Sequence, residues 1–166
     1  MTNVEDPKPE YQSFSGDAEF QLAVDKLLAQ PGRELRIFEP DGKALLLNSG
    51  ARLALLEAFL RGSRTRRIQL ALHDTEYIVR HCPRMMNFLR LFNHVVQINR
   101  THEEIRNLQD AFMVLDAQHY VRRPLATSTR GAVGLHDENE AQSMRSRFLE
   151  IWTASYPGLS STTAGL

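Results

Sequence analysis

Two small groups of residues in this chain have side chains suited to chemistry. His73 and Asp74 are adjacent, and a histidine beside a carboxylate can act as a general base. Arg100, Arg122 and Arg123 carry planar guanidinium groups, which bind phosphate or carboxylate through two parallel hydrogen bonds. The chain therefore offers two candidate sites: a hydrolytic centre at His73, and a pocket for a small anionic ligand.

Both arginines of the Arg122–Arg123 pair also have a structural interpretation. If both lie on one strand, they point to opposite faces, so only one of them can line a pocket. Either arginine can instead pair with a carboxylate at the end of the sheet. The available carboxylates are Asp110, Asp116 and Glu103.

The same alternation limits the catalytic interpretation of His73. Asp74 would face away from it on a strand, and it is better suited to cap the following helix. His81 and Cys82 are adjacent, but one cysteine and one histidine provide too few ligands for zinc. Cys82 is the only cysteine, so no intramolecular disulfide can form. We expect no metal site and no cofactor.

A basic run lies between Arg61 and Arg67. It places four arginines in seven residues: Arg61, Arg64, Arg66 and Arg67. The run could contact nucleic acid, but no aromatic residue is interleaved to stack on bases. Favourable charge at a helix C-terminus explains the run equally well. We therefore interpret it as a solvated loop and do not expect nucleic acid as the main partner.

The composition is that of an ordinary globular domain. Of the 166 residues, 42% are hydrophobic and 24% are charged. Lys plus Arg and Asp plus Glu both number 20, which argues against a protein that coats DNA. No stretch is apolar enough to cross a membrane, and the acidic N-terminus is not a secretory signal. We expect a cytoplasmic protein with no membrane contact.

Strand and helix patterns alternate along the chain and position these residues. Alternation of polar and apolar residues predicts strands at 34–38, 67–72 and 95–98, then a hairpin at 110–116 and 118–123 followed by a short strand. Helical spacing predicts helices from 17, at 49–61, at 75–92 with a break at Pro83, and through 148–152. We predict one α/β domain at 16–155, with a mixed, mostly parallel sheet and helices on both faces. Disordered tails are expected at 1–15 and 156–166.

The order of these elements, with segments such as Asp110–Asp116 and Phe148–Trp152, resembles the phospholipase D-like superfamily. More closely, the chain is similar to an uncharacterised bacterial branch that lacks the His-x-Lys catalytic motif. Some members of that branch carry acetyltransferase domains, so the resemblance implies such a domain as a partner. Single-motif members of the superfamily form two-fold dimers, which implies a homodimer.

The resemblance also implies which residues have lost their chemistry. In active members, a histidine of the motif His-x-Lys-x4-Asp attacks the phosphorus and the lysine binds the phosphoryl oxygens. With Asp116 at the Asp position, Gln109 takes the histidine position and Ala111 the lysine position. Neither side chain can do that work, so we expect a pseudoenzyme.

These observations together predict a non-catalytic module. It would bind a small anionic or phosphate-bearing ligand, or a protein partner, at the relic cleft. The expected ligand-binding residues are His73, Arg100, Gln109, Asp116 and Arg122. Two alternatives stay open: a structural, homodimeric or accessory interaction protein, and a divergent hydrolase or phosphotransfer enzyme that uses His73 with Asp74.

Overall fold

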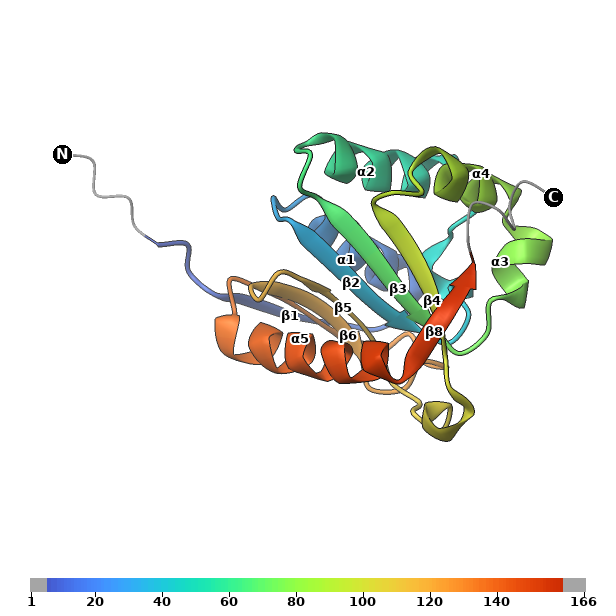
Figure 1. The fold of residues 1–166 in the computed structure, drawn as a ribbon. Helices are drawn as coiled ribbons and strands as arrows, with labels where there is room; N and C mark the ends of the chain where they lie inside the picture. Colours follow the sequence, from blue (N-terminus) through green and yellow to red (C-terminus); the bar gives the residue numbers. More distant parts are fainter. Residues whose placement is uncertain (1–5, 160–166) are drawn as a thin grey trace.

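The computed structural model describes residues 6–159, which form an eight-stranded mixed sheet with helices on both faces (Figure 1). The strand order is β1-β7-β6-β5-β2-β3-β4-β8. The strands are β1 (Glu10–Phe14), β2 (Glu34–Glu39), β3 (Arg67–Leu72), β4 (Val96–Thr101), β5 (Ala111–Leu115), β6 (His119–Arg123), β7 (Gly131–Leu135) and β8 (Ser155–Leu159). The helices are α1 (Asp17–Leu28), α2 (Gly50–Arg61), α3 (Glu76–His81), α4 (Pro83–Leu91) and α5 (Glu138–Thr153).

The predicted α/β class and the helices on both faces are confirmed, but the expectation of a mostly parallel sheet is wrong. Only the pairs β2–β3 and β3–β4 are parallel. The other five neighbouring pairs are antiparallel. The short connections that join β5, β6 and β7 leave no room for a crossover helix, so these strands must run in alternate directions. The edge strands β1 and β8 add two more antiparallel pairs.

Both edge strands lie where the sequence predicted disordered tails. Glu10–Phe14 forms β1 against β7, although only Phe14 in it is buried. Ser155–Leu159 forms β8 against β4 and buries Leu159 at its end. Edge strands are held by backbone hydrogen bonds on one side and tolerate polar residues and proline, so they lack an apolar pattern. Residues 1–5 and 160–166, the rest of the predicted tails, lie outside the described residues.

Local rules that depend on backbone geometry gave accurate boundaries. Pro83 begins α4 with only Cys82 between it and the end of α3, as its lack of an N–H requires. Ser49 caps α2 by accepting a hydrogen bond from the Arg52 N–H at 3.4 Å. At the start of α1, Gly16 occupies the N-cap position and Asp17 lies in the first turn.

The sheet separates two apolar cores of different size. Helices α1 to α4 cover one face, where residues such as Leu27, Ile37 and Leu70 form the larger core. Only α5 covers the other face, where Phe38 and Phe148 belong to a smaller core. Figure 1 shows α5 running along the lower part of the sheet, apart from the other helices.

Candidate functional site

The carboxyl ends of β2, β3 and β4 meet at one edge of the sheet. There β5 begins and β6 ends, because both are antiparallel to their neighbours. This carboxyl edge is defined by Glu39, His73, Arg100, Gln109 and Arg123. In sheets with parallel strands, ligands usually bind beyond these ends. The carboxyl edge is therefore the expected position of a ligand site.

His73 is held by hydrogen bonds at both ring nitrogens. Its Nε2 lies 2.9 Å from the Leu108 carbonyl oxygen, which can only accept, so Nε2 carries the proton. Its Nδ1, 2.7 Å from the hydroxyl of the buried Thr101, then accepts from that hydroxyl. The ring also lies edge-on to Phe38, with 5.2 Å between centroids. In this arrangement His73 has no free nitrogen for a general base.

Asp74 and Arg100 do not complete a catalytic group around His73. The Asp74 carboxylate accepts from the Glu76 N–H at 2.9 Å, but Thr75, not Asp74, occupies the N-cap position of α3. Arg100 donates from Nε to the His73 carbonyl oxygen at 3.3 Å. Strand alternation places the Arg100 side chain on the sheet face opposite His73. Within residues 6–159, Arg100 forms no ion pair with a carboxylate.

A buried ion pair fills the centre of the carboxyl edge. Glu39 and Arg123 are each only 2% exposed, and their side chains are bonded to each other. Arg123 also donates to the Ala126 carbonyl oxygen at 2.8 Å and lies over the Phe20 ring. Burial raises the pKa of Glu39, and the charge of Arg123 partly offsets that rise.

Ala111 lies between the two members of this pair. Ala111 pairs with Arg123 on β6. The next residue, Phe112, pairs with Phe38 on the antiparallel strand β2, so the register places Ala111 beside Glu39. The strand register therefore places Glu39, Ala111 and Arg123 in one row across three strands, on one face. Only a small residue in the middle lets the outer two meet. The resemblance assigns a lysine to position 111. In this structure that position is an alanine, and Glu39 and Arg123 contact each other across it.

The structure does not bring Asp116 to this edge. Asp116 lies in the turn between β5 and β6, at the opposite end of β5 from Gln109, with a φ of 52°. Its Oδ1 accepts from the Arg33 N–H at 3.1 Å and from the Glu34 N–H at 2.9 Å. Asp116 therefore fixes the start of β2 against the hairpin. Gln109 is exposed, and its carbonyl oxygen accepts from the Ala126 N–H at 2.7 Å.

Arg122 faces away from the buried pair, as strand alternation predicted. It lines a cleft of about 280 Å³ between the β5–β6 hairpin and α5, here named the hairpin cleft. Its other charged lining residues are Asp110, Glu140, Arg147 and the buried Arg123. Arg122 lies 3.6 Å from Glu140, and Arg147 lies 2.6 Å from Asp110. Sequence reasoning missed Arg147 and Glu140, although their spacing with Met144 places all three on one helix face.

The hairpin cleft and His73 are separate places. Phe38 and Phe112 lie between them on the α5 face, with 5.7 Å between their ring centroids. The expected ligand-binding residues are therefore distributed over three regions: His73 and Arg100 at the ends of β3 and β4, Gln109 and Arg122 at the ends of the hairpin strands, and Asp116 at its turn.

The remaining candidates are a metal site and the Cys82 thiol. No group of three His, Cys, Asp or Glu side chains between residues 6 and 159 could hold a metal ion. Cys82 is buried, and burial raises the pKa of its thiol. His81 is exposed and lies against Tyr77. No described helix has the length and apolar character needed to cross a membrane.

Solved structures define the class of fold. Nuc of Salmonella typhimurium, a phospholipase D family member, aligns over 92% of this chain and 100% of its own, with a TM-score of 0.66 and 13% identity. Phosphatidylserine synthase of Haemophilus influenzae aligns over 93% of this chain and 40% of its own, with a TM-score of 0.62 and 10% identity. The archaeal chromatin protein TrmBL2 aligns over 94% of this chain and 56% of its own, with a TM-score of 0.65 and 11% identity. The chain has a phospholipase D-like fold, as the resemblance implied.

The family follows from a sequence model. Residues 16–160 match the family described as Domain of unknown function (DUF7931), and the chain belongs to that family. No curated protein matches the chain significantly.

Proposed function

We propose that this protein is a non-catalytic phospholipase D-like module that binds a small anionic ligand in the hairpin cleft. The observation that carries the proposal is the pair of half-exposed arginines, Arg122 and Arg147, in a cleft that Asp110 and Phe112 also line. A cleft of about 280 Å³ suits a small metabolite better than a macromolecule.

The hydrogen bonding of these arginines leaves donors for a ligand. Arg122 and Glu140 are 3.6 Å apart, beyond a good hydrogen bond, so the guanidinium of Arg122 retains donors. Arg147 is bound to Asp110 through one terminal nitrogen, and its other terminal nitrogen has no hydrogen-bond partner among the described residues. A phosphate or carboxylate would take two parallel bonds from either guanidinium.

Loss of catalysis is supported by the state of each candidate group. Gln109 and Ala111 cannot act as nucleophile and phosphate ligand, and His73 has both nitrogens engaged. We expect no hydrolysis of a chromogenic phosphodiester above the buffer rate. Turnover that disappears in His73→Ala would instead establish the divergent hydrolase and end the non-catalytic interpretation.

The ligand is tested by calorimetry after a thermal-shift screen of inorganic phosphate, nucleotides, sugar phosphates and dicarboxylates. Removal of one charge-assisted bond costs about 1.5–3 kcal/mol, so Arg122→Ala and Arg147→Ala should each weaken a hit about tenfold or more. Arg130→Ala, which removes an exposed arginine elsewhere, is the matched control. A screen without hits, or hits unaffected by both cleft variants, contradicts the proposal.

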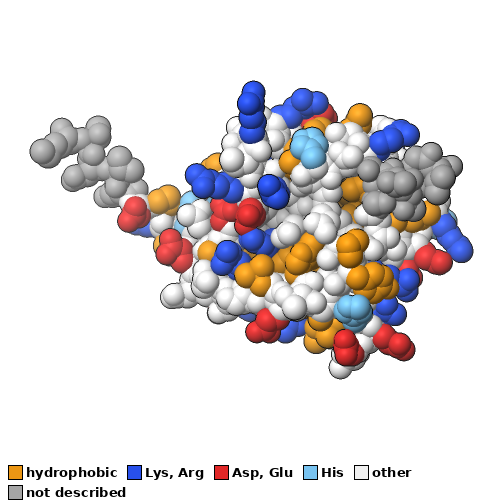
Figure 2. Space-filling view, in the orientation of Figure 1, with side chains coloured by type: hydrophobic (Ala, Val, Ile, Leu, Met, Phe, Trp, Pro, Cys, Tyr) orange, Lys and Arg blue, Asp and Glu red, His pale blue; other side chains and the backbone are white. Residues whose placement is uncertain are grey.

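A homodimer is the second candidate, favoured by one surface feature. Figure 2 shows hydrophobic side chains gathered over α5 and β8. Leu149 is 39% and Tyr156 is 36% exposed there. Light scattering at micromolar concentration tests this, and a monomer that stays monomeric contradicts it. The acetyltransferase-domain partner and the cytoplasmic location stay predictions.

A further inference from the structure

A second groove lies at the amino ends of β3 and β4, the edge opposite the one described above. It has a volume of about 1000 Å³ and lies between the α2–β3 and α4–β4 connections. Its charged lining side chains are Arg61, Arg64 and Arg66, and His94 joins them. No carboxylate lines it. In a chain with as many acidic as basic residues, this is a local excess of positive charge.

The three arginines differ in how they are held. Glu57 binds Arg61 through one oxygen at 3.0 and 2.8 Å and neutralises it. Arg66 donates to the Phe59 carbonyl oxygen at 2.8 Å, and its guanidinium carbon lies 5.2 Å from the Phe59 ring centroid. Arg64 is exposed and forms no hydrogen bond or ion pair with any residue between 6 and 159. Arg64 and Arg66 therefore provide the unneutralised charge, and contact with Phe59 fixes the position of Arg66.

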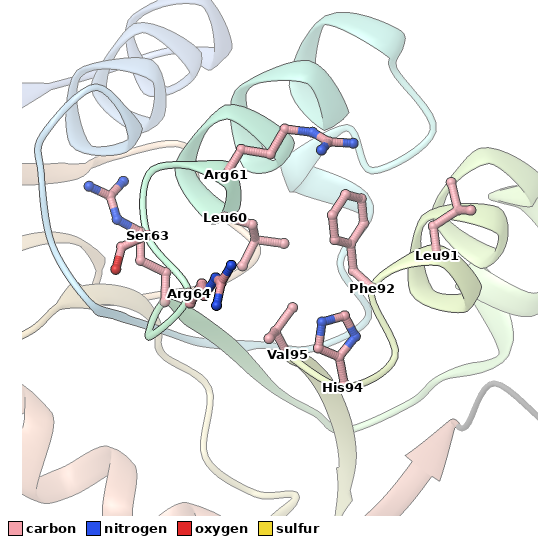
Figure 3. A pocket seen from close by; sticks show the side chains of 9 residues that line it. Leu60, Arg61, Ser63, Arg64, Leu91, Phe92, His94 and Val95 are labelled. Atoms are coloured by element: carbon pink, nitrogen blue, oxygen red, sulfur yellow. The ribbon is translucent and has the colours of Figure 1, made fainter.

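The groove also has an apolar wall that includes an aromatic ring. Leu60, Phe92 and Val95 contribute to it, and Leu91 is 64% exposed at its rim. Arg61 lies over the Phe92 ring, 5.6 Å from its centroid. Figure 3 shows Leu60, Phe92 and His94 turned toward one hollow, with Arg61 above Phe92. The sequence placed no aromatic near the arginines, but the fold brings Phe92 to them from a distant connection.

We propose that this groove binds single-stranded nucleic acid. Free guanidinium groups suit phosphates, and the partly buried Phe92 ring with the Arg61 guanidinium over it offers flat surfaces to unpaired bases. A duplex hides its base faces, and the carboxylates of an acidic peptide have no aromatic face to stack on the ring. Figure 2 shows Lys and Arg side chains gathered above α2 and its connection to β3, so the charge extends beyond the groove itself. The proposal does not depend on the hairpin cleft.

Fluorescence anisotropy with a labelled oligodeoxythymidine of about twelve nucleotides tests the proposal on the full chain. The wild-type protein should bind, with affinity falling between about 50 and 200 mM salt. Arg64→Glu should weaken binding at least about tenfold and reduce the salt slope by about one. Arg130→Glu makes the same charge change at another exposed arginine and should retain binding.

Phe92→Leu separates nucleic acid from a generic polyanion. It removes the ring and leaves the charges, so affinity for the oligonucleotide should fall while the salt slope stays unchanged. Thermal unfolding of each variant shows whether the fold is retained. The proposal is overturned if the wild-type protein does not bind at low salt, if Arg64→Glu and Arg130→Glu behave alike, or if polyglutamate or a duplex competes as well as the single strand.

Discussion

The two edges of the sheet both contain arginines, but they use them differently. At the carboxyl edge, Arg123 is buried and bonded to Glu39, and it closes the space that a catalytic lysine would need. At the amino edge, Arg64 is exposed and unpaired within the described residues. The number of arginines near an edge therefore says little about anion binding. What matters is whether each guanidinium already has a partner.

The largest effect should come from breaking the buried pair. Glu39→Ala leaves the Arg123 charge buried without its partner, which we expect to cost about 3–5 kcal/mol of unfolding free energy. Urea unfolding of the variant measures this. Glu39→Leu combined with Arg123→Met replaces both charges by apolar groups and should recover most of the loss. A single variant as stable as wild type would mean that the pair is not the structural centre of this edge.

A lysine at position 111 is the next test of the comparison. Ala111→Lys inserts a long cation between Glu39 and Arg123, so overpacking alone should cost about 1–3 kcal/mol. Ala58→Lys, on an exposed part of α2, should change stability by less than about 0.5 kcal/mol. The variant Gln109→His with Ala111→Lys should also show no phosphodiesterase activity. Activity in that double variant would show that the carboxyl edge is still a catalytic scaffold.

The sequence predicted the parts of this comparison that depend on local geometry. Strand alternation placed Arg122 and Arg123 on opposite faces, and Pro83 divided two helices at the expected residue. It did not predict that Glu39 pairs with Arg123, because that contact joins residues 84 positions apart through the register of three strands. Phe92 reached Arg61 for the same reason: two connections meet only after the sheet forms.

At the amino edge, the buried His119 should make the stability of the fold depend on pH. His119, buried near the β5–β6 turn, accepts a hydrogen bond from the His136 N–H at 3.0 Å through Nδ1. Burial, and then the charge of His136, lowers the pKa of His119 below 6.5. A lowered histidine pKa contributes stability that is complete above the unfolded value of 6.5 and is lost as pH falls through the folded value.

We therefore expect the wild-type unfolding midpoint to decrease as pH is lowered below 6.5. His119→Asn keeps an acceptor for the His136 N–H but cannot be protonated, so its midpoint should decrease less. Thermal unfolding from neutral to mildly acidic pH compares the two proteins. If the unfolding midpoints of the two proteins decrease equally with pH, groups other than His119 cause the loss of stability in acid.

The smallest effect should come from the exposed pair that most resembles the buried one. Arg122 and Glu140 are also an arginine and a glutamate, but their side chains are 42% and 53% exposed and 3.6 Å apart. Water screens such a pair, so Glu140→Gln should change stability by no more than about 0.5 kcal/mol. The same change removes the carboxylate that competes for Arg122. Any anion that binds the hairpin cleft should therefore bind the variant more tightly, and calorimetry with a screened ligand measures that gain. Weaker binding in Glu140→Gln would mean that Glu140 positions Arg122 for the ligand. The exposed Arg122–Glu140 pair would then prepare a binding site, whereas the buried Arg123–Glu39 pair closes one.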